Sequence, residues 1–182
     1  AAVIFNKFDY KHDSILFESK SGELIVKKQQ DNFILNFPAD KPEKTEIEPA
    51  LTEAIGLAPI EAYLGKEDFL LIYESEKQIY DINPDFEKLE AITQRGVIVS
   101  SPGKEYDFIS RFFAPAAGIK EDPVTGSAHT TLTPYWSKKL NKKEFTAYQA
   151  SARGGKLKCV DKGSRIEIAG KVTFYLEGLI EI

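Results

Sequence analysis

The residues best suited to chemistry lie in one loop, which follows an apolar, strand-like stretch at residues 108–113. The loop contains Pro and Gly residues and two adjacent carboxylates, Glu121 and Asp122, before a Thr-Gly-Ser sequence. Gly126 and Ser127 fall at a predicted helix start, where backbone N–H groups lack partners within the helix and can bind an anion. Asp122 stands close enough to meet that anion with a proton-transfer group. The pattern indicates chemistry next to a carboxyl group.

Each of these residues also has a plainer interpretation. Asp122 precedes Pro123, and Asp in that position commonly starts a turn, which the residues alone favour. Ser127 is a residue type that often caps a helix, and Gly126 is a type that tight turns use. His129, near the start of the helix, is expected to be a packing neighbour and not a catalyst. The residue types therefore leave the chemical and the structural interpretations open.

The run from Arg111 to His129 resembles the signature of the PhzF-like family of phenazine biosynthesis, whose members are related to diaminopimelate epimerase. The family typically reads R-F-F-A-P-x-x-G-I-x-E-D-P-V-T-G-S-A-H, and this sequence matches at nearly every fixed place. Further segments fit the family pattern and extend the resemblance over essentially the whole chain: Asn36–Pro38, Pro134–Trp136, Gln149–Gly155 and Leu176–Gly178.

The resemblance implies a cofactor-independent isomerase or epimerase that transfers a proton near the carboxylate of a small acid. It implies that Asp122 and Ser127 are catalytic. It also implies that the substrate is bound by Thr125, Gly126, Ser127 and Ala128. The sequence contains no metal-ligand cluster, P-loop or dinucleotide fingerprint, so neither a metal nor another cofactor is expected. By resemblance, the protein is expected to be a cytoplasmic homodimer.

The resemblance also implies an α+β fold of the diaminopimelate-epimerase type, with two pseudo-symmetric halves that each wrap a curved mixed sheet around a central helix. Many strands and few helices indicate α+β independently. Residues 1–38 are expected to be the remainder of the first half, which is incomplete here. Residues 39–170 would form the second half, and residues 171–182 a final strand that returns to the first. Family members are longer at the N-terminus, where a catalytic glutamate is expected, and Ala1–Phe5 resembles the tail of a helix from that segment.

Periodicity and turn residues predict the elements that position the loop. A meander of strands is expected over residues 14–37, and the polar residues 39–49, with two prolines, are the best candidate for a linker. One bent helix is expected over residues 127–140 despite Pro134. An Asn83 N-cap predicts a helix with Phe86, Leu89 and Ile92 on one face. The other expected elements are a helix at 51–55 and strands at 69–73, 97–99, 108–113, 144–149, 156–160, 165–168 and 172–182.

Composition excludes several classes of protein. The chain has 182 residues, of which 42% are apolar, and none of its apolar runs is long enough to span a membrane. A net charge of −4 argues against nucleic acid as the main partner. The single cysteine, Cys159, excludes an internal disulfide and a cysteine-rich zinc site, and it fits a reducing compartment. Diaminopimelate epimerase uses a pair of cysteines, so that specific activity is not expected.

Two functions therefore follow from the sequence. The favoured one is proton transfer on a small carboxylate. The alternative is a non-catalytic protein that keeps the acid-binding loop for ligand sensing or assembly, because an anion pocket without its base binds but does not turn over.

Overall fold

The computed structural model describes residues 1–8, 10–20, 22–93 and 95–179. Its sheet contains strands of the following bounds: β1 (Ser14–Ser19), β2 (Gly22–Gln29), β3 (Asn32–Pro38), β4 (Glu43–Thr45), β5 (Glu61–Leu64), β6 (Asp68–Ile72), β7 (Gly96–Pro102), β8 (Phe108–Phe113), β9 (Glu144–Gln149), β10 (Gly155–Asp161) and β11 (Arg165–Lys171). The helices are α1 (Ala2–Lys7), α2 (Pro49–Ile55), α3 (Glu76–Asp81), α4 (Phe86–Ile92), α5 (Gly126–Leu140) and the 3₁₀ turn η1 (Pro115–Ala117).

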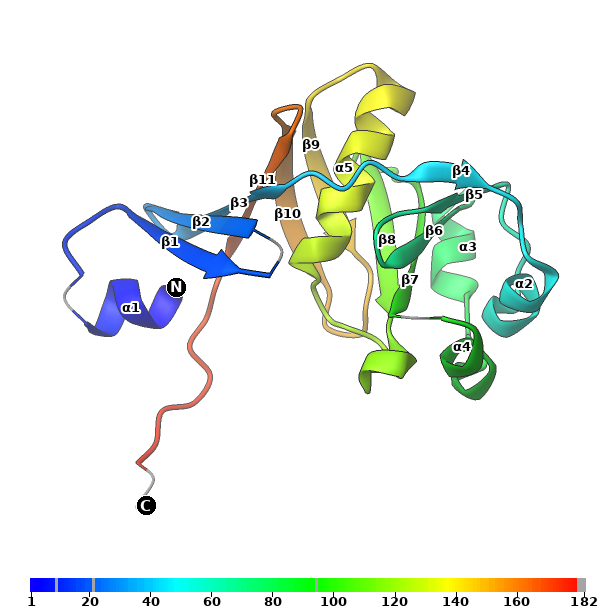
Figure 1. Cartoon of the computed structure of the whole chain (residues 1–182), viewed down its shortest axis with the longest axis horizontal. Helices are drawn as coiled ribbons and strands as arrows, with labels where there is room; N and C mark the ends of the chain where they lie inside the picture. The colour runs from blue at the N-terminus through cyan, green and yellow to red at the C-terminus, as the bar shows by residue number, and fades with distance from the viewer. Residues whose placement is uncertain (9, 21, 94, 180–182) are drawn as a thin grey trace.

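All of these strands belong to one sheet in the order β1-β2-β3-β11-β10-β9-β8-β7-β6-β5-β4 (Figure 1). The pairs β6–β7 and β8–β9 are parallel, and the others are antiparallel. A mixed sheet with few helices is the α+β class, so the expected fold class is confirmed. Within the described residues no helix is both long and apolar enough to cross a membrane.

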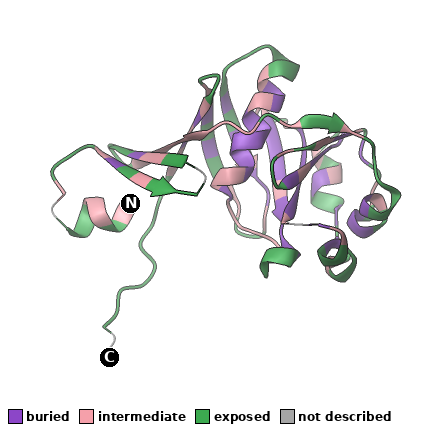
Figure 2. Cartoon of the chain, viewed as in Figure 1, coloured by how far each residue is buried: buried purple, intermediate pink, exposed green. Residues whose placement is uncertain are grey.

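The longest helix, α5, is enclosed by the sheet. It contacts β3 and β6, which have five other strands between them in the sheet order, as well as β10 and β11. Strands so far apart can meet one helix only where the sheet curves around it. Figure 2 shows many buried residues, in purple, in α5 and in the strands beside it. The Trp136 ring stacks on Phe108 at 5.7 Å between centroids, and its Nε1 donates to Ser100 Oγ at 3.0 Å. As expected, α5 continues as one helix across Pro134.

Three short helices cover the other face of the sheet. Leu51 of α2, Ile79 of α3 and Leu89 of α4 pack in one buried cluster with residues of β7 and β8. Alternate residues of β7 take part in the two layers: Val97 belongs to this cluster and Ile98 to the cluster around α5. Burial on both faces explains why β7 carries apolar residues at consecutive positions, from Val97 to Val99.

The sequence expectations for this layer were partly wrong. Helix α3 was not predicted, although Ser75 and Gln78 form a capping box at its start. Helix α4 is capped by Asp85 and not by Asn83, since the Asp85 carboxylate accepts a hydrogen bond from the Lys88 amide. A residue before proline is disfavoured in helical conformation, so Pro84 keeps Asn83 outside the helix.

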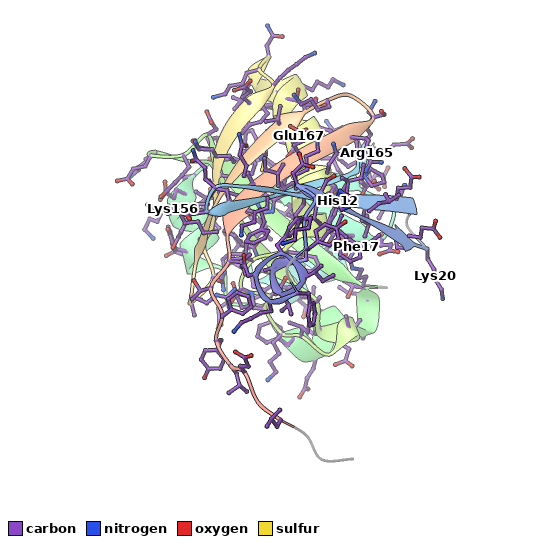
Figure 3. All side chains as sticks on the ribbon, turned by 90° about the vertical axis from the view of Figure 1, so that its left-hand side faces the viewer. His12, Phe17, Lys20, Lys156, Arg165 and Glu167 are labelled. Carbon is purple, nitrogen blue, oxygen red and sulfur yellow. The ribbon has the colours of Figure 1, made fainter. Side chains whose placement is uncertain are left out.

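The first strands form the expected meander, and Figure 3 looks onto this end of the molecule. The hairpin of β1 and β2 carries Phe17, with His12 in the exposed segment before it. Helix α1 packs Phe5 against Phe33 of β3 at 5.9 Å between ring centroids. Strand β3 then joins β11, which connects this end to the strands around α5.

Two segments differ from expectation. Residues 39–49, expected to be a linker, contain β4, which pairs with β5 at the edge of the sheet. Residues 172–179 form no strand, and the Tyr175 and Leu176 side chains are almost fully exposed. A strand needs a neighbouring edge for its hydrogen bonds. The contacts of this segment are instead with α1: Lys7 Nζ lies 2.7 Å from a Glu177 carboxylate oxygen and over the Phe174 ring. Residues 180–182 lie outside the described residues, and the division into domains stays a prediction.

Candidate active site

The loop after β8 folds back against the strand from which it comes. Ala114 and Ile119 form an isolated antiparallel bridge around the turn η1. Gly118 ends the turn with φ +78°, a conformation that favours glycine. The Asp122 amide then donates to the Phe112 carbonyl at 3.0 Å. These bonds hold the two carboxylates of the loop beside the end of β8.

Glu121 is bound to an arginine of β8. Arg111 Nε and Nη2 donate to its two carboxylate oxygens at 2.7 and 3.1 Å. Arg111 Nη1 also donates to the carbonyls of Ile79 and Ile82 at 3.1 and 2.6 Å, and the guanidinium lies 4.8 Å from the Phe113 ring centroid. The Arg111 and Glu121 side chains are only 14% and 22% exposed. Glu121 therefore fastens the loop to β8 and, through Arg111, to α3.

Asp122 takes part in a different network, in which the direction of each hydrogen bond is fixed. The Thr125 amide donates to Gln149 Oε1 at 2.7 Å, which identifies the other Gln149 terminus as the NH₂ group. That group donates to the Asp122 carbonyl at 2.7 Å and to Thr125 Oγ1 at 3.1 Å. Thr125 Oγ1 in turn donates to Asp122 Oδ2 in a short hydrogen bond. Gln149 is fully buried, so it orients the Asp122 side chain from within the fold.

The turn between β9 and β10 supports the same loop from outside. Ser151 Oγ donates to the Pro123 carbonyl at 2.8 Å and accepts from the Gly154 amide at 3.0 Å. A Cβ atom at Gly155 would lie 2.3 Å from Val124 Cγ2, closer than real Cβ atoms approach. The absence of a side chain at Gly155 therefore lets Val124 pack against this turn.

The N-terminus of α5 begins beside Asp122. Thr125, in extended conformation, is the N-cap, and Gly126 is the first helical residue. The alternative interpretation of Ser127 as the cap is therefore wrong, because the backbone already turns helical one residue earlier. No described side chain caps the helix, and its first turn contains no acidic residue. The backbone N–H groups of Gly126, Ser127 and Ala128 are thus positioned to bind an anion.

The predicted substrate-binding residues differ in what they can offer. Thr125 is buried, and its amide and hydroxyl are used to hold Gln149 and Asp122. The Ala128 side chain belongs to the core around α5, so its backbone N–H is the group available for binding. Gly126 and Ser127 are half-buried. Their roles toward a substrate stay predictions.

His129 lies one turn into α5 and is fully buried. Its Nδ1 is 2.8 Å from the Thr125 carbonyl, and a carbonyl can only accept, so Nδ1 carries the proton. Burial lowers the pKa of His129 to about 4, which keeps the ring neutral at neutral pH. This agrees with the expected packing role.

Two residues close to the site were not singled out by sequence reasoning. Gln149 lies in a segment that fits the family pattern, but nothing in its spacing indicated a role. Arg95, just before β7, reaches the first turn of α5, where its Nη2 donates to Ser127 Oγ at 2.6 Å. No sequence signal distinguished Arg95 from other surface cations.

The remaining candidates for redox or metal chemistry do not approach this loop. Cys159 is fully buried in β10, and burial raises the pKa of its thiol to about 12. A thiol of that kind is unsuited to proton transfer at neutral pH. Within the described parts of the chain, no group of three or more His, Cys, Asp or Glu side chains could hold a metal ion.

Comparisons with known proteins identify the family. The sequence model of the phenazine biosynthesis-like proteins, PhzC-PhzF, matches residues 1–178. The chain belongs to this family. Two uncharacterised isomerases of Pseudomonas aeruginosa are 40% and 42% identical over 182 residues, and each match covers all of this chain and 70% of the relative. PhzF-like membership therefore places the chain among relatives named as isomerases.

Solved structures share the fold. A PhzF-family protein of Enterococcus faecalis is 42% identical with a TM-score of 0.87, over 93% of this chain and 65% of its own. A putative PhzC/PhzF protein of Clostridium difficile is 35% identical with a TM-score of 0.88, over 99% and 70%. A hydroxyproline epimerase of Agrobacterium vitis, at 11% identity and a TM-score of 0.56, covers 96% and 61% and shows the fold alone. The epimerase-like fold predicted from the sequence is confirmed, and this chain spans roughly two thirds of these proteins.

Proposed function

We propose that this protein takes part in cofactor-independent isomerisation or epimerisation of a small carboxylic acid by proton transfer near the carboxylate. The observation that carries the proposal is the placement of Asp122, an oriented carboxylate, beside the uncapped N-terminus of α5. The helix start suits the carboxylate of the substrate, and Asp122 suits the proton that moves.

In the proposed reaction, a base removes a proton from the carbon next to the carboxylate. The electron pair of the broken C–H bond moves onto the carboxylate oxygens, which gain negative charge. The N–H groups of Gly126, Ser127 and Ala128, together with the Ser127 hydroxyl, stabilise that charge. A second group returns a proton to the opposite face of the carbon, or to another carbon of the same molecule, and the overall reaction is an isomerisation.

Asp122 is proposed as an acid/base or substrate-orienting group in this scheme. Thr125 and Gln149 are positioning residues, because each of their polar groups is used to hold Asp122 or its loop. The family resemblance implies a glutamate as principal base, and we assign no residue of this sequence to that role. Cytoplasmic location and a homodimer are further proposals that rest on the same resemblance.

The class of substrate has support from the distant epimerase. That protein was solved with trans-4-hydroxy-L-proline, a small amino acid that carries a carboxylate next to the carbon where epimers differ. From this ligand only its class is carried over to the present protein: a small acid with an acidic hydrogen beside or conjugated to its carboxylate.

Deuterium wash-in tests the proposal. Small amino acids, hydroxy acids and unsaturated acids are incubated with the protein in D₂O, and exchange at carbon is followed by ¹H NMR. We expect exchange with at least one acid and its loss in Asp122→Ala. Calorimetric binding of an acid without any exchange would instead support the non-catalytic, acid-binding alternative. Neither exchange nor binding across the panel would overturn both.

A further inference from the structure

Arg95 connects the start of two parallel strands with the start of α5. It directly precedes Gly96, the first residue of β7, whose register partner is Asp68, the first residue of β6. The guanidinium lies 5.6 Å from the Phe112 ring centroid, and Nη2 reaches Ser127 Oγ at 2.6 Å. A cation is therefore held at the helix end where the substrate anion is proposed to bind.

The hydrogen bond between Arg95 and Ser127 has only one possible direction. A guanidinium has N–H donors and no acceptor, so Ser127 Oγ must accept. The single proton of the Ser127 hydroxyl must then point away from Arg95. A hydroxyl that accepts from a cation is also a stronger donor, because hydrogen bonds in a chain polarise one another. The Ser127 hydroxyl is therefore free to donate its proton to another group, and it is a stronger donor than a serine without the arginine contact.

Two carboxylates hold Arg95 in this position. Its Nη1 lies 3.0 Å from Asp68 Oδ2 and 2.9 Å from Glu67 Oε2. The Asp68 side chain is 4% exposed, and its other oxygen has no partner in the described part of the structure. Because these carboxylates balance the charge of Arg95, a second, direct ion pair with a substrate would gain little. The effect of Arg95 therefore passes through Ser127.

We propose that Arg95, held by Asp68, is a positioning residue that fixes the Ser127 hydroxyl as a hydrogen-bond donor toward the substrate carboxylate. This inference rests on the proposed function of the α5 N-terminus. A donor aimed at oxygens that gain charge during the reaction stabilises the transition state more than the bound substrate. Loss of Arg95 should therefore lower kcat more than it raises KM.

A double-mutant cycle tests this proposal on the acid that exchanges in the wash-in assay. We expect Arg95→Gln and Ser127→Ala each to lower kcat by about 10- to 100-fold, with little further loss in the double variant, since Arg95 acts only through the Ser127 donor. Arg95→Lys keeps a positive charge for Asp68 and should retain more activity than Arg95→Gln. If the kcat loss of the double variant equals the product of the losses in the two single variants, the proposal is overturned.

Controls separate this effect from a general loss of charge or fold. Arg165 of β11 donates to the Asn36 carbonyl at 2.6 Å and to the Glu23 carbonyl at 2.9 Å, away from the loop (Figure 3). Arg165→Gln removes the same charge and should leave kcat within about 2-fold. Circular dichroism and thermal unfolding establish that each variant is folded before kcat is compared.

Acetate titration gives a readout that needs no turnover. Acetate should shift the backbone amide resonances of Gly126, Ser127 and Ala128 in the wild-type protein. Arg95→Gln should weaken this binding several-fold, with no additional weakening in the Ser127→Ala background. This result would sustain the role of Arg95 even if no acid exchanged deuterium and the proposed reaction failed. Equal acetate affinity in Arg95→Gln and the wild type would overturn the role of Arg95.

Discussion

The loop after β8 carries two adjacent carboxylates with different surroundings. Glu121 lies on the side of the loop that faces Arg111, and Asp122 on the side that faces Thr125 and the start of α5. Glu121 receives two hydrogen bonds from Arg111, which also serves two carbonyls at the C-terminal end of α3. Asp122 receives one from Thr125, and its surroundings open onto an uncapped helix end. Both carboxylates are partly buried, so burial alone does not distinguish a structural acid from a chemical one.

The two carboxylates differ in how many of their oxygen atoms accept a hydrogen bond from a side chain of the protein: both in Glu121, and Oδ2 in Asp122. Glu121 is matched by a bidentate guanidinium, whose planar fork fits both carboxylate oxygens. Asp122 is oriented through Oδ2 by a network that begins at the buried Gln149. Glu121 therefore fixes the loop to β8, whereas the network around Asp122 orients one carboxylate beside the start of α5. Variants on the Glu121 side should change stability, whereas variants of Asp122 itself should change activity.

The largest loss of stability is expected for Arg111→Met. It leaves Glu121 and the carbonyls of Ile79 and Ile82 without their donor, and leaving a buried charge and polar groups unpaired costs about 3 kcal/mol. Chemical denaturation measures this loss. Adding Glu121→Gln to the same protein should restore part of it, because the unpaired charge is then gone. A double variant less stable than Arg111→Met would contradict the role given to this pair.

Gln149→Leu should lower both stability and activity, because Gln149 is buried in the fold and its hydrogen bonds hold Thr125 and the Asp122 carbonyl. The substitution leaves the Thr125 amide and the Asp122 carbonyl without partners, at a cost of about 1–3 kcal/mol. It also frees the Thr125 hydroxyl from the group that orients it, so exchange at the substrate carbon should fall in the folded protein. Gln149→Glu keeps the shape of the side chain but replaces the donating NH₂ group with an acceptor, so exchange should fall in this variant as well. Full activity in Gln149→Leu would show that Asp122 needs no orientation from β9.

Low pH should lower the folding stability through His129, which is hydrogen-bonded to the carbonyl of Thr125, the residue that orients Asp122. Burial lowers the pKa of His129 to about 4, so its stabilising neutral form is favoured above pH 6.5 and the benefit is lost as the pH falls toward 4. Burial raises the pKa of Asp68 to about 6, so this group instead favours the fold as the pH falls from 6 toward 4.

His129 and Asp68 change the stability in opposite directions as the pH falls, so removing Asp68 should reveal the effect of His129. Asp68→Asn should make the protein lose about 3 kcal/mol of stability between pH 6.5 and 4, a steeper loss than in the wild type. Denaturant unfolding at a series of pH values gives both curves. Parallel curves for the two proteins would show that Asp68 does not titrate as the structure implies.

The smallest effect is expected for Gly126→Ala at the open end of the helix. A Cβ atom there would lie 3.4 Å from Leu35 Cδ1, an ordinary contact, and stability should change by less than about 1 kcal/mol. Gly155→Ala is the contrasting variant, since its Cβ would collide with Val124 and displace the loop. Thermal unfolding compares them. Equal destabilisation of the two would mean that the turn after β9 does not support the loop.

Local patterns predicted much of this fold. The bounds expected for β8 and β9 match the structure, because both strands are short apolar or alternating runs bounded by turn residues. Helix α3 was missed because six residues show too little periodicity, although its capping box was present. Of the strand expected over residues 172–182, the described part, residues 172–179, does not form and pairs with none of the described strands.

The site was predictable only where it is local in sequence. Asp122, Gly126 and Ser127 lie in one continuous run and were identified together. Gln149 reaches Thr125 from β9, 24 residues away, and Arg95 reaches Ser127 from the position before β7, 32 residues away. Their roles follow from the curvature of the sheet around α5, which no local spacing encodes. Substrate binding and catalysis by the loop residues stay predictions.

The most direct test of the central claim compares the two adjacent carboxylates in one assay. Deuterium wash-in is measured for wild type, Asp122→Asn and Glu121→Gln with the same acid, each corrected for the folded fraction from unfolding curves. We predict that Asp122→Asn loses at least about 100-fold in exchange rate with little change in stability. Glu121→Gln should lose stability and keep exchange within about 2-fold per folded molecule. Wild-type exchange in Asp122→Asn, or an equal loss in Glu121→Gln, would contradict the division of this loop into an anchored and a chemical side.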